Sequence, residues 1–183
     1  EPGWGHVMIK RRAERDPDGA VEAEAAYARM AKDAGIEMAW TGVLRSDRGE
    51  PFFVTDRFDR VGAGRLHMQT VAALLEVDFR EATLDYSELL RVVHGVTRDI
   101  RATEEMYRRM IFNARALNRD DHLKNHAFLM RASGAWQLAP AYDLSFSQGP
   151  GGEHTLTIGD EGRRPGTSAF AEVAKDAGIR PRR

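Results

Sequence analysis

The sequence predicts an α+β fold built from two lobes, and three observations support this prediction. Residues 1–60 read as a strand, a helix and a hairpin, whereas residues 61–183 are mostly helical with one further hairpin. The composition changes near Val61 to Gly64, which we interpret as the junction between the lobes. Of the 183 residues, 42% are hydrophobic, enough for a genuine core and too many for wholesale disorder. We therefore expect a small, strand-rich N-lobe over residues 1–60 and a larger helical C-lobe over residues 61–183.

Charge and residue usage exclude several classes of protein. The 27 Lys and Arg residues balance 28 Asp and Glu residues, so the net charge of -1 gives no general attraction for nucleic acid. The absence of cysteine excludes disulfide scaffolds, thiol catalysis and Cys-ligated zinc, and it fits a reducing compartment. No apolar run approaches the roughly 20 residues that a membrane helix needs. We expect a cytoplasmic protein that neither enters a membrane nor binds nucleic acid directly.

Residue types predict the elements of the N-lobe. The charged stretch that contains Pro17 and Gly19 reads as a loop, and Gly35 is the expected C-cap of the helix before it. The polar turn at residues 46–49 separates two strands of a hairpin. In chain order, we expect a strand, a helix and two hairpin strands at Gly5 to Lys10, Ala20 to Ala34, Glu37 to Leu44 and Pro51 to Phe58.

The C-lobe pattern is mainly helical. Asp85 followed by Glu88 forms a capping box that opens a helix. We expect three further helices, at Met68 to Leu75, Thr103 to Leu117 and Thr167 to Ala177. In the helix that begins at Thr103, apolar residues recur on one side at Met106, Met110, Ile111, Ala114 and Leu117. The runs at residues 126–130 and 135–140 flank a turn at residues 132–134 and predict a second hairpin.

The loop at residues 118–125 carries the densest chemistry in the chain. Phosphoryl transfer needs a carboxylate to orient the attacking hydroxyl, a cation to offset charge and an oxygen ligand for Mg²⁺. Asp120, Lys124 and Asn125 supply these three groups. The interval from Asp120 to Asn125 is the one between Asp and Asn in the protein-kinase catalytic loop. A solvated polar loop is the alternative interpretation of that interval taken alone.

A second oxygen ligand is expected after the second hairpin. Asp143 follows the predicted strand, where its carboxylate can meet Asn125 across the hairpin and form an oxygen-rich site suited to Mg²⁺. The alternative is an aspartate that only begins a turn.

Two charged residues of the N-lobe complete a phosphate-binding pattern. Lys10 ends a strand and Glu24 lies on the next helix, and in kinases a strand lysine binds phosphates and pairs with a helix glutamate. Glu22 competes with Glu24 for this role, and each residue taken alone is more typical of a solvated surface charge.

The segment at residues 53–60 ends the first hairpin at the lobe junction. There the backbone of Asp56 and Phe58 could bind an adenine ring, and Asp59 could reach a ribose hydroxyl. A surface strand with alternating charges is the alternative interpretation.

Together these motifs resemble the HipA family of bacterial serine/threonine-protein kinase toxins. The matches are D-x-H-x-K-N at Asp120, His122, Lys124 and Asn125, P-x-Y-D-L at Pro140, Tyr142, Asp143 and Leu144, and R-F-D-R at Arg57 to Arg60. Similarity runs from about Val7 to Ile179. The resemblance implies a protein-kinase-like fold that uses ATP and Mg²⁺ to phosphorylate Ser or Thr of protein targets, aminoacyl-tRNA synthetases among them. It also implies a DNA-binding antitoxin as partner.

The resemblance assigns roles to individual residues. Asp120 is the proton acceptor, in a catalytic set with His122 and Lys124, and Asn125 and Asp143 hold Mg²⁺. Lys10 contacts phosphates beside Glu24. The other nucleotide-binding positions are the hinge residues Asp56, Arg57, Phe58 and Asp59 and the lining residues His122, Leu123, Lys124, Asn125 and Tyr142.

The family pattern extends beyond this chain. Its phosphate-covering loop precedes the strand of Lys10, and further helices follow the region that ends near Ile179, so we expect a chain truncated at both ends. Two other functions stay open at this point. One is a small-molecule phosphotransferase on the same fold, and the other is a non-catalytic remnant that binds a partner.

Overall fold

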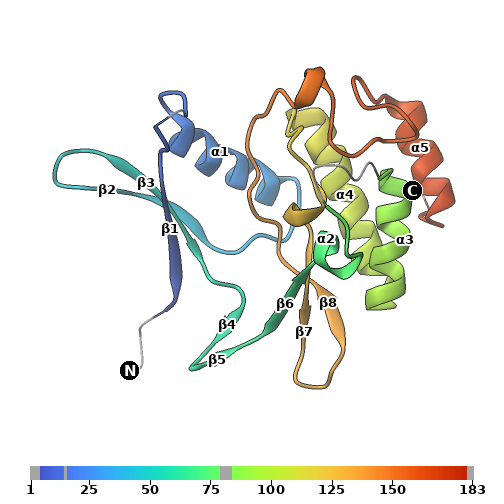
Figure 1. Ribbon diagram of the computed structural model, residues 1–183, viewed down its shortest axis with the longest axis horizontal. Coiled ribbons are helices and arrows are strands. Elements are labelled where there is room, and N and C mark those ends of the chain that lie inside the picture. The colour runs from blue at the N-terminus through green and yellow to red at the C-terminus, as the bar shows by residue number, and fades with distance from the viewer. Residues whose placement is uncertain (1–4, 15, 79–83, 181–183) are drawn as a thin grey trace.

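The computed structural model describes residues 5–14, 16–78 and 84–180. Its N-lobe is a three-stranded antiparallel sheet in the order β1-β3-β2, crossed on one face by a single helix (Figure 1). These elements are β1 (Val7–Arg11), α1 (Ala20–Asp33), β2 (Thr41–Arg45) and β3 (Pro51–Asp56). The register places Lys10 of β1 opposite Phe53 of β3.

The predicted N-lobe elements are confirmed, with one correction. The expected strand at Glu37 to Leu44 begins only at Thr41. Before it, Met38 forms an isolated parallel bridge with Ala141, and the Ala141 amide donates to the Glu37 carbonyl at 2.8 Å. These residues therefore bond to the C-lobe and not to the neighbouring strand.

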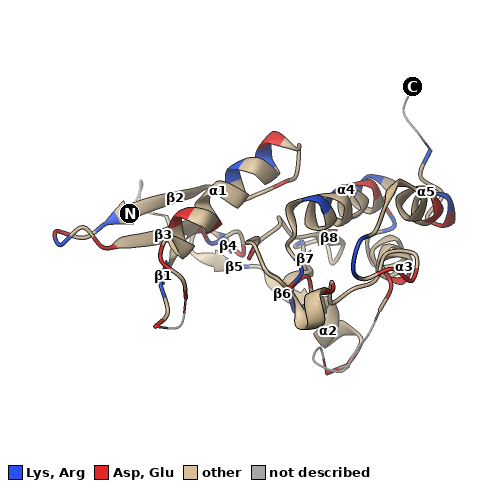
Figure 2. Ribbon diagram, turned by 90° about the horizontal axis from the view of Figure 1, so that it is seen from above, with Lys and Arg blue, Asp and Glu red and all other residues tan. Residues whose placement is uncertain are grey.

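The C-lobe combines a second three-stranded sheet with a group of helices, and Figure 2 shows it on the other side of the molecule from the first sheet. Its sheet has the order β6-β7-β8, from β6 (His67–Thr70), β7 (Ala127–Met130) and β8 (Trp136–Leu138). Its helices are α2 (Val71–Leu74), α3 (Tyr86–Thr97), α4 (Ile100–Ala116) and α5 (Thr167–Asp176), with 3-10 turns η1 (Leu123–Asn125) and η2 (Pro150–Gly152). The short pair β4 (Arg60–Val61) and β5 (Gly64–Arg65) lies between the lobes, where the junction was predicted.

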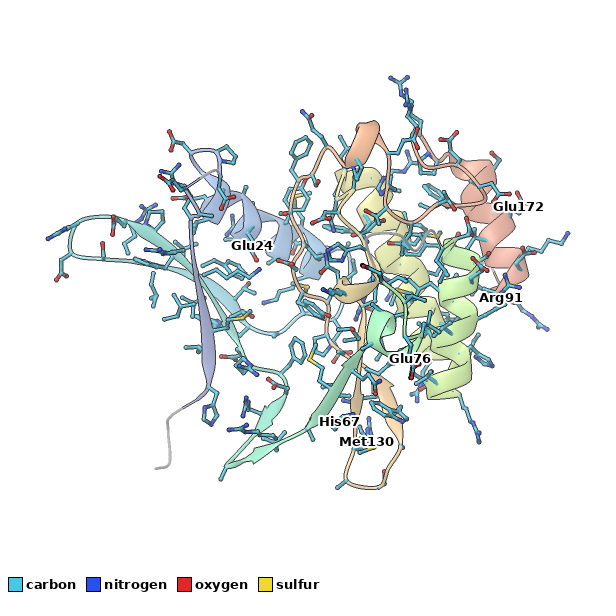
Figure 3. The ribbon with its side chains drawn as sticks, viewed as in Figure 1. Glu24, His67, Glu76, Arg91, Met130 and Glu172 are labelled. Atoms are coloured by element: carbon cyan, nitrogen blue, oxygen red, sulfur yellow. The ribbon has the colours of Figure 1, made fainter. Side chains whose placement is uncertain are left out.

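The helix predicted at Met68 to Leu75 is wrong in its first half. Met68 pairs with Leu129 across the β6-β7 ladder, which begins at the His67 and Met130 pair labelled in Figure 3. Hydrogen bonds to a distant strand override the local helical preference here. The helix starts only at Val71, where the Thr70 hydroxyl caps it by accepting from the Ala73 amide at 3.2 Å.

The long C-lobe helices follow their capping signals. The capping box of Asp85 and Glu88 is present in both directions at the start of α3. Helix α4 begins three residues before the predicted Thr103, because Asp99 caps it through the Arg101 amide at 3.0 Å. Leu117 was wrongly placed on its buried stripe, since it is the left-handed C-cap and is exposed.

The two lobes differ in the size of their cores. The main C-lobe cluster contains fifteen buried hydrophobic residues, among them Met106, Met110 and Leu89. The cluster beneath α1 has four, namely Val21, Ala25, Ala28 and Phe53. Within the described ranges, no helix combines the length and apolar character that crossing a bilayer requires.

Candidate active site

A cavity of about 460 Å³ lies where the lobes meet. It gathers eight of the residues predicted to bind nucleotide, from β1, α1, the end of β3 and the segment after β8. These residues are Lys10, Glu24, Asp56, Arg57, Phe58, Asp59, Tyr142 and Asp143. Apolar side chains such as Met8, Met38 and Met68 supply much of the remaining wall. A mostly apolar cavity with a few convergent polar groups is the usual form of a small-molecule site.

One lysine at the end of this cavity joins both lobes. Lys10 Nζ lies 2.7 Å from Glu24 Oε1 of α1 and 2.5 Å from Asp143 Oδ1 of the C-lobe. Burial works against the charge of Lys10, but the two carboxylates outweigh it and raise the pKa of the ammonium. Lys10 therefore stays protonated and can offer its charge to an anionic ligand.

The structure shows which of the two helix glutamates, Glu22 or Glu24, pairs with Lys10. Glu24, labelled on α1 in Figure 3, is the partner of Lys10. Burial raises the pKa of Glu24, and the hydrogen bond from Lys10 opposes that rise. Glu22 instead pairs with Arg45 at 2.9 Å. The helical turn directs the two glutamates to different sides, because positions two apart do not share a face.

The predicted hinge presents backbone groups to the cavity. The Asp56 amide donates to the Trp40 carbonyl at 3.0 Å, and the Arg57 amide donates to the His6 carbonyl at 2.8 Å. Among the described residues, none accepts a hydrogen bond from the Phe58 amide. The Phe58 N–H group therefore remains a candidate for an adenine ring, whereas the Asp56 amide, which was also expected to face the ring, is already bonded to Trp40.

Asp59 lines the cavity but its carboxylate is already engaged. Arg57 donates to both of its oxygens, at 2.7 and 2.6 Å, and Arg60 lies 3.4 Å away. The bidentate bond from Arg57 lowers the pKa of Asp59 against the opposing effect of burial. A ribose hydroxyl would have to share this carboxylate with Arg57.

The loop at residues 118–125, predicted to be catalytic, folds back on itself. Asn125 Nδ2 donates to the Asp120 carbonyl at 2.8 Å, and the Tyr142 hydroxyl donates to the Lys124 carbonyl at 2.5 Å. His122 Nε2 lies 3.8 Å from Asp120 Oδ1. Tyr142 also packs its ring against the hinge residue Phe58, 5.7 Å between centroids. The side chain of Tyr142 thus connects the hinge to the loop.

The Asp120 carboxylate has a raised pKa. Its side chain is 61% exposed. Partial burial raises its pKa, His122 lowers it, and the nearby charges of Asp143 and Asp121 raise it again. A carboxylate with a raised pKa accepts a proton more readily, which suits a general base.

Asp143 has an unusual backbone. Its φ of 57° lies in the left-handed region, which costs free energy for a residue other than glycine. The surrounding contacts hold it there, including the Lys10 ion pair and the bridge at Ala141. Strained residues of this kind concentrate at functional sites.

Leu123 was predicted to line the nucleotide site, but it does not line the cavity. Its side chain is buried in the main C-lobe core beside Phe128. The pattern around it alternates between polar and apolar residues, and the apolar member anchors the 3-10 turn from below. Leu123 therefore anchors the turn that carries His122 and Lys124. Like Leu123, the predicted nucleotide-binding residues His122, Lys124 and Asn125 are not among the residues that line the cavity.

Sequence reasoning missed a buried polar network behind the loop. His154 is buried and has its Nδ1 3.1 Å from Asp121 Oδ2. The Tyr86 hydroxyl donates to the same oxygen at 3.0 Å. The only signal in the sequence was a second aspartate directly after Asp120.

The chain was compared with known proteins. The family model described as HipA-like C-terminal domain matches residues 1–183. No curated protein sequence matches the chain.

Two solved structures share its fold. One is HipA of Shewanella oneidensis MR-1, from a toxin-antitoxin complex of HipA, HipB and operator DNA, with a TM-score of 0.76 and 20% identity. The match covers 95% of this chain and 46% of that one, so the chain spans less than half the length of that HipA. The other is the proinflammatory kinase CtkA of Helicobacter pylori, with a TM-score of 0.67, 11% identity, and coverage of 93% of this chain and 73% of that one. The fold is thus the two-lobed, kinase-like one that the sequence predicted.

Proposed function

This chain belongs to the HipA-like C-terminal domain family, and from that premise we propose that it forms the catalytic core of an ATP- and Mg²⁺-dependent serine/threonine-protein kinase. The observation that carries the proposal is the position of Lys10, bonded at once to Glu24 and to Asp143 at the end of the cavity between the lobes. Phosphoryl transfer relies on positioning and on charge stabilisation, and this cluster supplies charge where the phosphates of a nucleotide would lie.

Asn125 and Asp143 carry oxygen atoms of the kind that Mg²⁺ prefers. The Asn125 amide nitrogen is used by the Asp120 carbonyl at 2.8 Å, which leaves the Asn125 side-chain oxygen as a ligand. Asp143 bonds Lys10 through Oδ1 and retains its second carboxylate oxygen. Two oxygen donors plus phosphate oxygens suit Mg²⁺, which would neutralise charge on the phosphates. Asn125 and Asp143 are therefore the residues that would hold it.

Asp120 would orient the attacking hydroxyl and accept its proton. Its carboxylate is exposed, so a protein substrate can reach it, and its raised pKa favours proton transfer. The Phe58 amide and the apolar wall would hold the adenine ring.

Two solved structures support phosphoryl transfer and a partner protein. CtkA is described as a kinase, and the Shewanella HipA is described in a complex with HipB and operator DNA. By this likeness we extend the proposal to a DNA-binding antitoxin as partner. The acceptor that we propose, a protein hydroxyl such as that of an aminoacyl-tRNA synthetase, rests on the motif resemblance alone.

The test is Asp120→Asn in the protein that carries this chain. We expect phosphoryl transfer from γ-labelled ATP to a protein acceptor to fall by about 10² to 10⁴-fold, the usual contribution of a general base. Calorimetry should show Mg-ATP binding little changed, because Asp120 does not line the cavity. Asp47→Asn, in the exposed turn between β2 and β3, is the matched control and should behave as wild type.

Other outcomes separate the alternatives. Normal labelling by Asp120→Asn would remove the proposed base. Transfer to metabolites with none to protein would favour a small-molecule phosphotransferase. Absence of Mg-ATP binding by the wild type would leave a non-catalytic, partner-binding role.

A further inference from the structure

Two adjacent aspartates of the catalytic loop have opposite environments. The Asp120 side chain is 61% exposed, whereas that of Asp121 is 0% exposed. Successive side chains in extended backbone point to opposite sides. Asp120 therefore faces solvent, where a substrate would bind, while Asp121 points into the C-lobe. Because one peptide bond joins the two residues, a displacement of Asp121 also displaces Asp120.

The buried carboxylate of Asp121 has a donor on every side. Oδ2 is 3.0 Å from the Tyr86 hydroxyl and 3.1 Å from His154 Nδ1. Oδ1 accepts from the amides of Thr155 at 3.1 Å and Leu156 at 3.5 Å. These donors come from two parts of the chain that are more than thirty residues from Asp121 on either side. The carboxylate thus fixes the loop against two separate elements.

The network continues to the helix that precedes the loop. Asn113 of α4 donates to the Tyr86 hydroxyl at 2.9 Å, and Asn118 donates to Asn113 at 3.0 Å. The hydroxyl of Thr155 reaches the Arg119 carbonyl at 3.1 Å. Buried or half-buried polar groups therefore hold the start of the loop at Asn118, Arg119 and Asp121.

Stability alone does not account for such a network. Well-packed apolar side chains usually replace a buried charge with no loss of stability, because burying a carboxylate carries a large desolvation cost. A fully satisfied polar network does give one fixed geometry. That property is useful at a catalytic loop, where an error of about 1 Å costs about 10²-fold in rate.

We propose that Asp121 and His154 are positioning residues, which lock the catalytic loop so that Asp120 is held in its working geometry. The segment that follows β8 then helps to position the catalytic loop, since its residues His154, Thr155 and Leu156 contact the Asp121 carboxylate. The kinetic part of this proposal rests on the proposed kinase function. Its structural part does not.

The test compares three pairs of variants in the protein that carries this chain. Asp121→Ala removes all four contacts, whereas Asp121→Asn keeps an acceptor for the two amides. His154→Ala removes the ring, whereas His154→Asn keeps a donor near the position of Nδ1. Val173→Ala, on the buried face of α5, is a control that lowers stability without touching the network, and it is compared with wild type. Each variant is examined by hydrogen exchange and by kinase kinetics.

Hydrogen exchange of residues 118–125 and 154–157 gives a readout that needs no activity. We expect exchange in Asp121→Ala and His154→Ala to be at least about tenfold faster in these segments, and unchanged in α3. His154→Asn should restore most of the protection. Val173→Ala should not expose the loop selectively.

Kinetics supply the second readout. We expect kcat to fall about 10 to 100-fold in both alanine variants, with KM for Mg-ATP within about twofold of wild type, because an orientation error affects the transition state and not nucleotide binding. The proposal would be overturned if the loop of Asp121→Ala exchanged hydrogen at the wild-type rate. It would also be overturned if Asp121→Ala lost protection over the whole C-lobe, as a variant that is only less stable would. Failure of the wild type to bind Mg-ATP would refute the kinase function, while the exchange data would still decide on the lock.

Discussion

The two lobes hold their functional groups in different ways. In the N-lobe, Lys10 lies on β1, whose residues Val7 and Ile9 are 47% and 56% exposed, and its position depends on two ion pairs. In the C-lobe, Asp120 follows a helix of the main core and is backed by the buried Asp121. Asp120, the proposed proton acceptor, is thus held by buried packing and hydrogen bonds, whereas Lys10, the proposed phosphate-binding group, is held by charge.

Few polar contacts join the lobes. Lys10 bonds Asp143, the Glu37 amide donates to Glu105 of α4 at 3.0 Å, and Tyr27 of α1 bonds the last turn of α4. Between them lies a small apolar cluster formed by Ala31, Ile36, Phe112, Ala141 and Leu144. The apolar contact between the lobes is therefore smaller than the main C-lobe core.

The largest expected effect comes from the same substitution, leucine to alanine, made once in each lobe to compare their packing. Leu89 of α3 is 0% exposed and Leu44 of β2 is 54% exposed. Leu89→Ala should lower the free energy of unfolding by about 2–5 kcal/mol, because it leaves a cavity in the core. Leu44→Ala should cost less than about 0.5 kcal/mol. Chemical denaturation measures both, and equal losses would contradict the comparison.

The second effect tests whether charge places the phosphate-binding group. Lys10→Met should lower kcat/KM for ATP by about 10²-fold, since removal of a preorganised cation at the phosphates costs this much. Arg11→Met, the next residue on the exposed strand, is the matched control and should change kcat/KM less than about threefold. Steady-state kinetics with varied ATP separate the variants. Similar losses in the two would show that the lysine acts only through general charge.

How far the sequence predicts each lobe follows from the range of the contacts. Lys10 and Glu24 are fourteen residues apart and belong to one strand-loop-helix unit, so their pairing could be anticipated. The capping box of Asp85 is local and was predicted in full. The Asp121 network could not be predicted, because His154 is thirty-three residues away and only the folded chain brings it near.

The helix wrongly predicted at Met68 has the same cause. Its residues suit a helix locally, but Met68 finds a hydrogen-bonding partner in Leu129, sixty-one residues later.

In the site, the motifs predict which residues are present, but only the structure shows where their side chains point. Leu123 belongs to the motif and points into the core, and Asp59 belongs to the hinge and is occupied by Arg57.

A smaller effect concerns the pH dependence of the C-lobe. Asp85 caps α3 and also accepts from the Thr157 hydroxyl at 2.8 Å and the Asp160 amide at 3.1 Å. Burial opposes the charge of Asp85, but these bonds and that of the Ser87 amide outweigh it and lower its pKa. A carboxylate with a depressed folded pKa stabilises the fold above its unfolded pKa of about 3.9, and this contribution is lost as pH falls through the folded pKa.

Asp85→Ala should therefore cost about 1–2 kcal/mol at neutral pH, as loss of an N-cap does. The difference from wild type should shrink as the pH falls below about 4, because the carboxylate of the unfolded chain takes up a proton there while that of the folded chain stays ionised down to its lower pKa. Thermal unfolding between pH 3 and pH 7 measures both curves. A constant difference over this range would mean that the charge of Asp85 has no part in the cap.

The smallest effect tests the tie between the lobes. The Tyr27 hydroxyl of α1 donates to the Ala116 carbonyl at the end of α4, and the Tyr27 ring meets Phe112 edge-on at 6.3 Å. Tyr27→Phe keeps the ring and should cost about 1 kcal/mol, the net value of one hydrogen bond. Tyr107→Phe is the matched control, because it removes a bond of 2.9 Å from Tyr107 to the Phe170 carbonyl within the C-lobe.

Both phenylalanine variants should lose similar stability, but only Tyr27→Phe should loosen the lobes. Hydrogen exchange should therefore rise in α1 and at the end of α4 in Tyr27→Phe, and near α5 in Tyr107→Phe. Because Lys10 and Glu24 move with the N-lobe, KM for ATP should rise about two to fivefold in Tyr27→Phe alone, while kcat stays near wild type. A fall in kcat without a change in KM would instead mean that Tyr27 acts on the loop of Asp120. It would contradict the claim that the two lobes hold their functional groups in different ways.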